Sequence, residues 1–395
     1  MGTITRIGRA ATAGLTCLVL SGLAAGAPGA RAAAAGPAEP VSSPVAAVRA
    51  PVPSPGSLGQ LSAVSCTSAR SCWAVGSYLS GPRHTSNEAL HWNGTTWSVV
   101  PTPDPGTAAT DHNGLGGVTC TGPGNCWAVG GVSSFPYQAS RNEALHWNGI
   151  RWSMVAVPDP GHDAGGLYGL GAVSCPLRHD CWATGGLITA NGIHRTVVMH
   201  WNGATWSAVT MPRSAGDLSG LACISSKDCW IIGSRNGLNE AMHWNGTRWS
   251  VVPTPRHGDS AVGLACTGAR NCWTAGISML HWNGARWSAG VTPRRPRPVS
   301  RSGIACTGKK NCWAVEEYFN SAGTGLNLAL HWNGTRWSKV SMPQPGGIGP
   351  DAASALASVA CTSPGNCWAV GTAILDAGIQ RNEALHWNGT RWTRG

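Results

Sequence analysis

Residues 66–97, CTSARSCWAVGSYLSGPRHTSNEALHWNGTTW, decide the fold because their pattern recurs seven times along the chain. Each copy has a C-x5-C pair, a Trp directly after it and an HWNGxxW string further on, at periods of 40 to 55 residues. All 21 Trp fall on three positions per copy, which in the first copy are Trp73, Trp92 and Trp97. A unit this small cannot bury a hydrophobic face alone, so the repeat predicts a propeller or a solenoid. The Trp residues therefore belong to the scaffold rather than to one site.

The N-terminal segment has the pattern of a secretory signal. Arg6 and Arg9 precede an apolar stretch, residues 10–25, that is too short to span a bilayer. Ala30-Arg31-Ala32 then supplies an A-x-A cleavage site. We expect residues 1–32 to be a signal peptide, no transmembrane segment elsewhere, and a secreted, extracellular protein.

The cysteine pattern predicts a disulfide in every repeat. Cys17 is removed with the signal, and the remaining 14 Cys enter an oxidising compartment. Zinc binding is the alternative, but a spacing of five with an adjacent Trp does not match usual zinc-ligand spacing. We expect no metal ion and no cofactor. The expected disulfides are Cys66–Cys72, Cys120–Cys126, Cys175–Cys181, Cys223–Cys229, Cys266–Cys272, Cys306–Cys312 and Cys361–Cys367.

Each repeat contains four short strand patterns. In the first repeat these are LSAVSC (61–66), CWAVGSY (72–78), NEALHW (87–92) and TTWSVVP (95–101), with Asn93-Gly94 as a hairpin turn between the last two. The first strand is rich in Gly, Ala and Ser, which suits a crowded innermost position. Four strands per unit predict an all-β fold over residues 58–395, a seven-bladed β-propeller with four antiparallel strands per blade.

The string WAVGG (127–131), followed by HWNG and a last strand with Trp, resembles the kelch-type blade of the galactose-oxidase-like propellers. The resemblance covers all seven repeats and implies the fold rather than a chemistry, because such propellers serve as enzymes, glycan binders and scaffolds. Most copies keep one Gly of the pair, and the Cys pair is not part of the kelch pattern. No match to a copper site is present, since the chain has only four Tyr.

Residues 33–57 are rich in Ala, Pro, Ser and Val and have the composition of a linker. The last repeat stops at Gly395, without the Pro-rich exit of the other repeats. The missing piece resembles VRAPVPSPG (48–56), which matches VVPTPDPG (99–106). We therefore predict that residues 46–53 continue the last blade and close the ring, with a mobile linker as the alternative.

The turns of a blade sort onto two faces. The C-x5-C and Asn-Gly turns share one face, which we call the clamped face, and the variable connections share the other, which we call the loop face. Binding residues concentrate on loops, so the loop face is a candidate ligand site. The candidate ligand-binding residues that break the repeat there, or lie between the fifth and sixth repeats, are Asp111, His112, Tyr137, Tyr168, His257, Arg294 and Arg295.

Positive charge concentrates on the clamped face. Without the three Arg of the signal, the net charge falls from +11 to +8, whereas eleven cations against Asp180 and Asp228 leave the clamped face at +9. Such a face attracts polyanions such as anionic envelope polymers. The alternative is that these cations stack on Trp or only aid solubility. The cations are Arg70, Arg151, Arg178, Lys227, Arg248, Arg270, Arg286, Lys309, Lys310, Arg336 and Arg391.

Two further features invite a chemical interpretation. Glu316 and Glu317 replace small residues in the sixth repeat and are the candidate catalytic residues, able in principle to do acid-base work or to bind a cation. The alternative is exposed charge without a role, because neighbours on a strand point to opposite sides. The His of HWNG recurs in every blade, where copies cannot converge on one metal ion, so we expect it to pack or hydrogen-bond structurally.

We conclude that the sequence favours a secreted, monomeric binding protein for glycans or anionic envelope polymers. The alternatives are a polysaccharide-active hydrolase or lyase, and a scaffold that binds a protein partner. We do not expect nucleic acid to be the partner of an exported protein.

Overall fold

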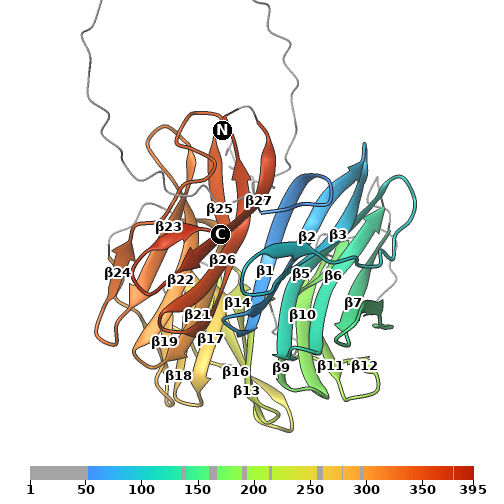
Figure 1. Cartoon of the computed structure of the whole chain (residues 1–395). Coiled ribbons are helices and arrows are strands. Elements are labelled where there is room, and N and C mark those ends of the chain that lie inside the picture. The colour runs from blue at the N-terminus through green and yellow to red at the C-terminus, as the bar shows by residue number, and fades with distance from the viewer. Residues whose placement is uncertain are drawn as a thin grey trace, which may run out of the picture. The chain divides into compact units, whose positions relative to one another are not determined.

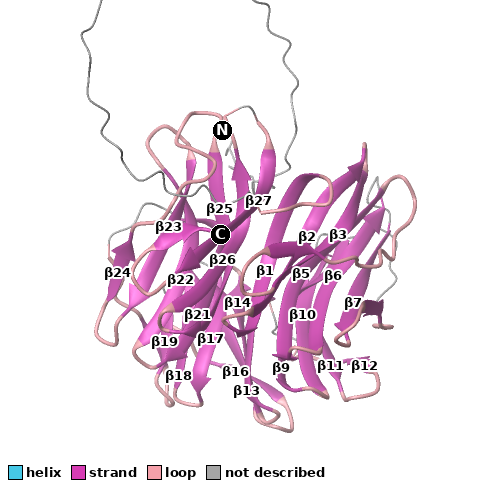
Figure 2. Cartoon of the chain, viewed as in Figure 1, coloured by secondary structure: helices cyan, strands magenta, loops and turns pink. Residues whose placement is uncertain are grey.

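The computed structural model contains only β-strands as regular secondary structure within the residues that it describes (Figure 2). No helix able to cross a membrane is found in that part of the chain. The described residues are 52–134, 139–159, 167–188, 194–212, 216–255, 261–277, 279–293, 298–376 and 378–395. The predicted signal peptide, residues 1–32, lies outside them.

The strands follow the repeat, with four strands to each copy. The first unit consists of β1 (Ser57–Ser68), β2 (Ser71–Gly81), β3 (His84–Trp92) and β4 (Trp97–Val99). The others are β5 (Asp111–Gly122), β6 (Asn125–Ser134), β7 (Ala139–Trp147) and β8 (Trp152–Met154); β9 (Leu167–Leu177), β10 (Asp180–Ile188), β11 (His194–Trp201) and β12 (Trp206–Ala208); β13 (Asp217–Ser225), β14 (Asp228–Arg235), β15 (Leu238–Trp244) and β16 (Trp249–Val252); β17 (Ala261–Gly268), β18 (Asn271–Gly276), β19 (Leu280–Trp282) and β20 (Trp287–Ala289); β21 (Pro298–Gly308), β22 (Asn311–Phe319), β23 (Gly325–Trp332) and β24 (Trp337–Val340); and β25 (Ala353–Ser363), β26 (Asn366–Ile374), β27 (Gln380–Trp387) and β28 (Trp392–Arg394).

Strands within a unit pair antiparallel in chain order, which confirms the four-stranded repeat. A single parallel pairing of Thr85 with His112 joins β3 to β5, and one of Gly325 with Ala353 joins β23 to β25. These pairings merge the first two units, and the last two, into eight-stranded sheets, while the third, fourth and fifth units remain separate four-stranded sheets.

The seven predicted disulfides are confirmed. In the first unit Cys66 lies directly opposite Cys72 on the neighbouring strand, with a Cα–Cα distance of 4.0 Å. The other six pairs have the same Cα–Cα distance, and five of them also lie directly opposite each other, whereas the register of the third unit shifts at its Cys pair. Closing so short a loop contributes about 2 to 3 kcal/mol in the chain-entropy model. Each disulfide joins two neighbouring strands of one unit, so it stabilises one hairpin rather than the contact between units.

The first strands of successive units pack against one another, and β25 of the last unit packs against β1 of the first (Figure 1). The units are thus twisted four-stranded sheets whose innermost strands meet, which is the arrangement of a β-propeller. Crowding explains the small side chains of these strands. A Cβ on Gly117 of β5 would lie 2.9 Å from the carbonyl oxygen of Gly171 on β9.

A second close approach explains the Gly that follows the WAV string. A Cβ on Gly76 of β2 would lie 1.8 Å from the carbonyl oxygen of Gln60 on β1, where no side chain fits. The same clash would arise at Gly130, Gly185, Gly233 and Gly371. This Gly lets the first strand bulge against the second, as the register shift between Leu61 and Ala63 records.

Trp side chains fill the spaces between units. Trp73 of the first unit packs against Trp147 and Trp152 of the second, with ring centroids 4.7 and 5.1 Å apart. The pattern continues around the chain, and Trp368 of the last unit packs against Trp92 and Trp97 of the first at the same two distances. The apolar core is therefore a series of clusters between neighbouring units, including one that joins the last unit to the first.

Buried amide–carboxyl hydrogen bonds also join several units. In three places, an Asn side chain at the start of a third strand donates to a Glu of the next unit. The pairs are Asn87 with Glu143 at 2.6 Å, Asn382 with Glu88 at 2.7 Å, and Asn327 with Glu383. Burial raises the pKa of Glu88 to about 7 and that of Glu143 and Glu383 to about 8, although the amide hydrogen bonds oppose the shift.

The start of the described chain contacts the last unit. The Asn382 side chain donates to the Pro53 carbonyl at 2.8 Å, as the Asn87 side chain donates to the Pro103 carbonyl at 3.0 Å within the first unit. Val52 packs on the cluster between the first and last units. Residues 46–51 of the predicted closing segment lie outside the described residues, and Val52 and Pro53 are not in a strand.

Removal of these contacts is expected to destabilise the protein. A chain that begins at Leu58 loses the Pro53 acceptor and the Val52 side chain, at a cost of about 2 kcal/mol. Thermal unfolding followed by circular dichroism should give a lower Tm for this chain than for residues 33–395. A chain that begins at Arg49 keeps both contacts and is the control. Equal Tm values for all three chains would show that the contacts do not stabilise the fold.

The buried Glu residues are expected to make stability pH-dependent. A folded-state pKa raised above the usual 4.5 stabilises the fold at low pH, and this contribution is lost as the pH rises through the folded pKa. For Glu143, with a pKa of about 8, the loss between pH 6 and pH 9 is about 2 to 3 kcal/mol. Glu143→Gln should unfold like the wild type at pH 5 and show a flatter decrease in Tm up to pH 9. Parallel curves for the two proteins would contradict the assignment.

Candidate functional site: the basic clamped face

The clamped face is built from two turns of each unit that lie side by side. In the first unit, the Cβ and Cγ of Arg70, on the Cys turn, lie about 3 Å from where a Cβ on Gly94 would be. The Trp92 indole N–H also donates to the Ala69 carbonyl at 3.1 Å. The same contact of a cationic stem with a turn Gly recurs for Lys227 with Gly246, Arg270 with Gly284, and Lys310 with Gly334.

The Asn-Gly turns are confirmed, but they are four-residue loops rather than two-residue hairpin turns. Trp92 pairs with Trp97, and the Asn93 side-chain oxygen accepts hydrogen bonds from the backbone N–H groups of Thr95 and Thr96 at 2.9 and 3.0 Å. Gly94 has a φ of 99°, which a residue with a Cβ rarely adopts. The Asn side chain thus accepts hydrogen bonds from the backbone N–H groups of the turn, and the Gly leaves room for the side chain of the neighbouring cation.

The recurring His of the HWNG string packs and hydrogen-bonds within its own unit, as predicted. The His91 ring packs against the Trp73 ring at a tilt, with ring centroids 4.7 Å apart, and its Nε2 lies 3.3 Å from the Ser71 hydroxyl. In the other units the partner is the Asn or Asp before the second Cys. Burial lowers the pKa of His91, His146, His281 and His331. Among the described residues, no cluster of three metal-ligating side chains is found.

All eleven predicted cations of the clamped face are exposed. None of them is within 4.0 Å of a carboxylate in the part of the chain that the structure describes. The two acids of this face are already engaged, because Asp180 lies 2.8 Å from His200 and Asp228 lies 2.9 Å from His243. Their carboxylates are mostly buried, and each lies beside a His rather than beside one of the eleven cations.

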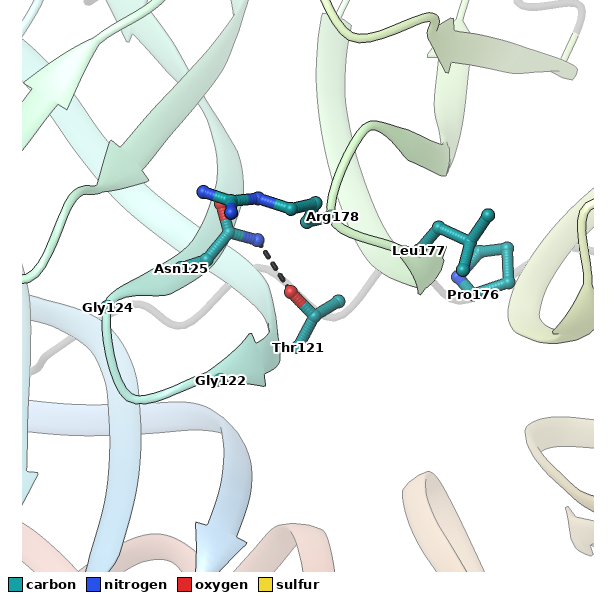
Figure 3. Close-up of a pocket in the computed structure, with 7 residues that line it drawn as sticks. All are labelled: Thr121, Gly122, Gly124, Asn125, Pro176, Leu177 and Arg178. Carbon is teal, nitrogen blue, oxygen red and sulfur yellow. Dashed lines mark hydrogen bonds between the residues drawn. The ribbon is translucent and has the colours of Figure 1, made fainter.

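A cavity of about 480 Å³ interrupts this face between the second and third units. Figure 3 shows the Arg178 guanidinium extending from the third unit toward Asn125 of the second. The Asn125 amide donates to the Thr121 hydroxyl at 2.6 Å, and its oxygen pairs with His146. Arg178 also lowers the pKa of His146, after the larger effect of burial. The other residues that line the cavity are Gly122, Gly124, Pro176 and Leu177.

Sequence reasoning had placed Arg178 on this face but had missed the cavity. Its signal is a departure from the repeat, because Pro176 and Leu177 stand where other turns have Thr, Ser or Gly, apart from Ile224 in the fourth. The adjacent turn of the second unit, Gly122-Pro123-Gly124, carries almost no side chain. The cavity forms where these two unusual turns meet.

Among the predicted loop-face residues, the structure describes the side chains of Asp111 and His112. Asp111 is buried, and its carboxylate accepts the Ser134 hydroxyl at 2.7 Å and the Ala108 N–H at 3.0 Å. The Ser134 hydrogen bond lowers the Asp111 pKa, partly opposed by burial. His112 is half-buried in β5, and Tyr168 lies in β9 with its side chain outside the described residues. The remaining candidates, Tyr137, His257, Arg294 and Arg295, are outside them as well.

A second hollow, of about 300 Å³, lies on the inner strands of the first three units. Its lining includes Ser62, Ser77, Gly116, Ser133 and Leu170, and no charged side chain lines it. Small neutral residues of this kind suit the crowded centre of the propeller and offer no positively charged side chain to an anion.

The alternative interpretation of Glu316 as exposed charge is wrong. Glu316 is fully buried, whereas Glu317 on the opposite side of β22 is half-buried and lies against Gly325. Glu316 occupies the position of the Gly that approaches the first strand in other units. The register between β21 and β22 therefore skips two residues, between Val299 and Ser302, instead of one. The two carboxylates do not face each other as a catalytic pair.

No protein-family model and no curated protein matches the chain. Among solved structures, the structure of U3-55K matches at 11% identity with a TM-score of 0.51, over 78% of this chain and 88% of that chain. The WD40 β-propeller domain of Doa1 matches at 10% identity and a TM-score of 0.48, over 83% and 93%. The six-bladed, fucose-recognising β-propeller lectin of Aleuria aurantia matches at 12% identity and a TM-score of 0.43, over 71% and 93%. At such identities, the likeness concerns the fold alone.

The packing of a cation on a turn Gly can be tested with two matched substitutions. Gly149 and Gly284 have φ values of 94° and 93°, so an Ala at either position costs on the order of 1 kcal/mol. A Cβ on Gly284 would lie 2.5 Å from Arg270 Cγ, whereas at Gly149 the nearest atom is 3.4 Å away. Gly284→Ala should therefore lower the Tm more than Gly149→Ala does. Equal decreases would mean that the Arg270 stem does not rest on the turn.

Proposed function

We propose that this chain is exported, that it forms a seven-bladed propeller of the kelch-like type, and that it binds anionic glycans or envelope polymers through its clamped face. The packing of β25 against β1, and of Trp368 against Trp92 and Trp97, supports closure after seven blades. The Gly at the close approach between the first two strands supports the kelch-like type. Seven disulfides suit an oxidising compartment, in agreement with a signal peptide at residues 1–32. The hydrogen bond from Asn382 to the Pro53 carbonyl supports residues 46–53 as the ring-closing segment.

The observation that carries the ligand class is the uncompensated charge of the clamped face. Eleven exposed cations are distributed over all of the units, while the two acids are held by His200 and His243. A single exposed ion pair contributes little, about 0 to 1 kcal/mol. A polymer that carries many negative groups can contact several blades at once, and such multivalent binding gains affinity without any strong individual contact.

The elution of residues 33–395 from immobilised polymers tests the proposal. We expect retention on polygalacturonate and on poly(glycerol phosphate), none on dextran, and release as salt screens the exposed charges. Reversal of charge at Arg248, Arg286 and Arg336 to Glu should weaken retention on the order of tenfold at low salt, because these side chains lie on the clamped face.

A second triple variant controls for net charge. Arg195, Arg235 and Arg381 are exposed at the loop-face ends of their blades, and their replacement by Glu changes the net charge by the same amount. This control should be retained like the wild type. Equal weakening in both variants would mean that binding depends on overall charge rather than on the clamped face. The proposal would be overturned if the protein were retained only on dextran, or bound only a protein partner.

A further inference from the structure

The cavity between the second and third units has a composition that no other turn of the clamped face reproduces. In the second, fifth, sixth and seventh units, the first turn residue is a Thr whose hydroxyl accepts from the following Asn amide. The third unit has Pro176 there instead, followed by Leu177, which is 47% exposed. Pro176 and the exposed Leu177 add an apolar surface to the clamped face, which also exposes Ile150 in the Asn-Gly turn of the second unit.

Charge in the cavity comes from one residue. Among the lining residues, only Arg178 is ionised, and its guanidinium extends across the gap between the two units (Figure 3). In the first, fourth, fifth and sixth units the cation two residues before the second Cys rests on its own turn Gly, but the second unit has Gly124 at that position. Arg178 therefore lies beside open space, with donors suited to a carboxylate or a phosphate.

Two of the residues that line the cavity, Gly122 and Gly124, present only backbone to it. A Cβ on Gly122 would meet no atom within 4 Å, so a ligand can approach the chain closely there. The polar side chains of Thr121 and Asn125 also line the cavity. A sugar ring has one face that is more apolar than the other, and hydroxyl groups around its rim. The lining of the cavity offers matching groups, which are apolar side chains, a cation and polar side chains.

We propose that this cavity binds one acidic sugar unit of the polymer, with its carboxylate or phosphate on Arg178 and its ring against Pro176 and Leu177. This inference rests on the proposed function and deepens it. The clamped face as a whole would bind the polymer by charge, whereas the cavity between the second and third units would recognise a single sugar of that polymer. The shared ligand chemistry is an anionic group carried on a pyranose.

Calorimetric titration with short ligands tests the assignment, because short ligands cannot gain from multivalency. The probes are trigalacturonate for the carboxylate source, glucose 1-phosphate for the phosphate source, and maltotriose as the neutral control. We expect one site for at least one acidic probe and none for maltotriose. Arg178→Gln should weaken acidic binding about tenfold, and Arg178→Lys should retain part of it.

A neutral substitution separates the cavity from the general charge. Gly122→Leu places a side chain in the open space without changing the charge, and should abolish binding of the short acidic probe. Gly308 ends β21 as Gly122 ends β5, and a Cβ there also meets no atom within 4 Å. Gly308→Leu is therefore the matched control and should bind normally.

The outcomes distinguish the two proposals. Full binding of the short probes by Gly122→Leu or by Arg178→Gln would overturn the cavity assignment, as would the absence of any short-probe binding by a wild-type protein that retains long polyanions. In both cases, retention of long polyanions would still support the proposal that the clamped face binds such polymers. If long polyanions are not retained either, the proposed function itself fails.

Discussion

The packing of one indole ring into the space between two sheets is the contact on which the rest of the molecule depends. Each second-strand Trp lies between the first and third strands of its own sheet and contacts two Trp of the next unit, one of them edge-on, as Trp73 does with Trp152 at 85°. Because the ring belongs to one unit and its pocket to the next, no unit can bury its core alone. The disulfides and turns only hold each unit in the shape that this contact requires.

The close approach between the first and second strands sets a second constraint. Gly76 and its equivalents let the two backbones meet, which keeps the inner end of each sheet narrow enough for neighbouring first strands to pack. The sixth unit meets the same constraint differently, since Glu316 forces an additional residue out of register on β21. The register shift on β21 thus accommodates the Glu316 side chain, which is fully buried.

Features that lie within one repeat could be predicted from the sequence. The Cys pairs, the Asn-Gly turns, the four strands and the role of the recurring His all depend on residues close together in the chain, and periodicity made them visible. Features between units could not be predicted in the same way. Asn87 and Glu143 are 56 residues apart. Asn87 and Glu88 are adjacent in the sequence, and nothing there shows that Asn87 binds the second unit while Glu88 binds the seventh. The cavity was missed for the same reason, because Gly124 and Leu177 become neighbours only when the sheets are arranged around the ring.

The distribution of the buried Asn–Glu pairs makes the junctions between units unequal. The pairs run in one direction from the sixth unit through the seventh and first to the second, and stop there, because Val197 occupies the Glu position in the third unit. The junction after the second unit is also the one that contains the cavity. Within the described residues, this junction is joined by Trp127 and apolar contacts, as are the junctions after the third, fourth and fifth units, without a buried Asn–Glu hydrogen bond. A molecule held between Arg178 and Gly122 would bridge this junction, so that occupancy and the mechanical stiffness of the ring would rise together.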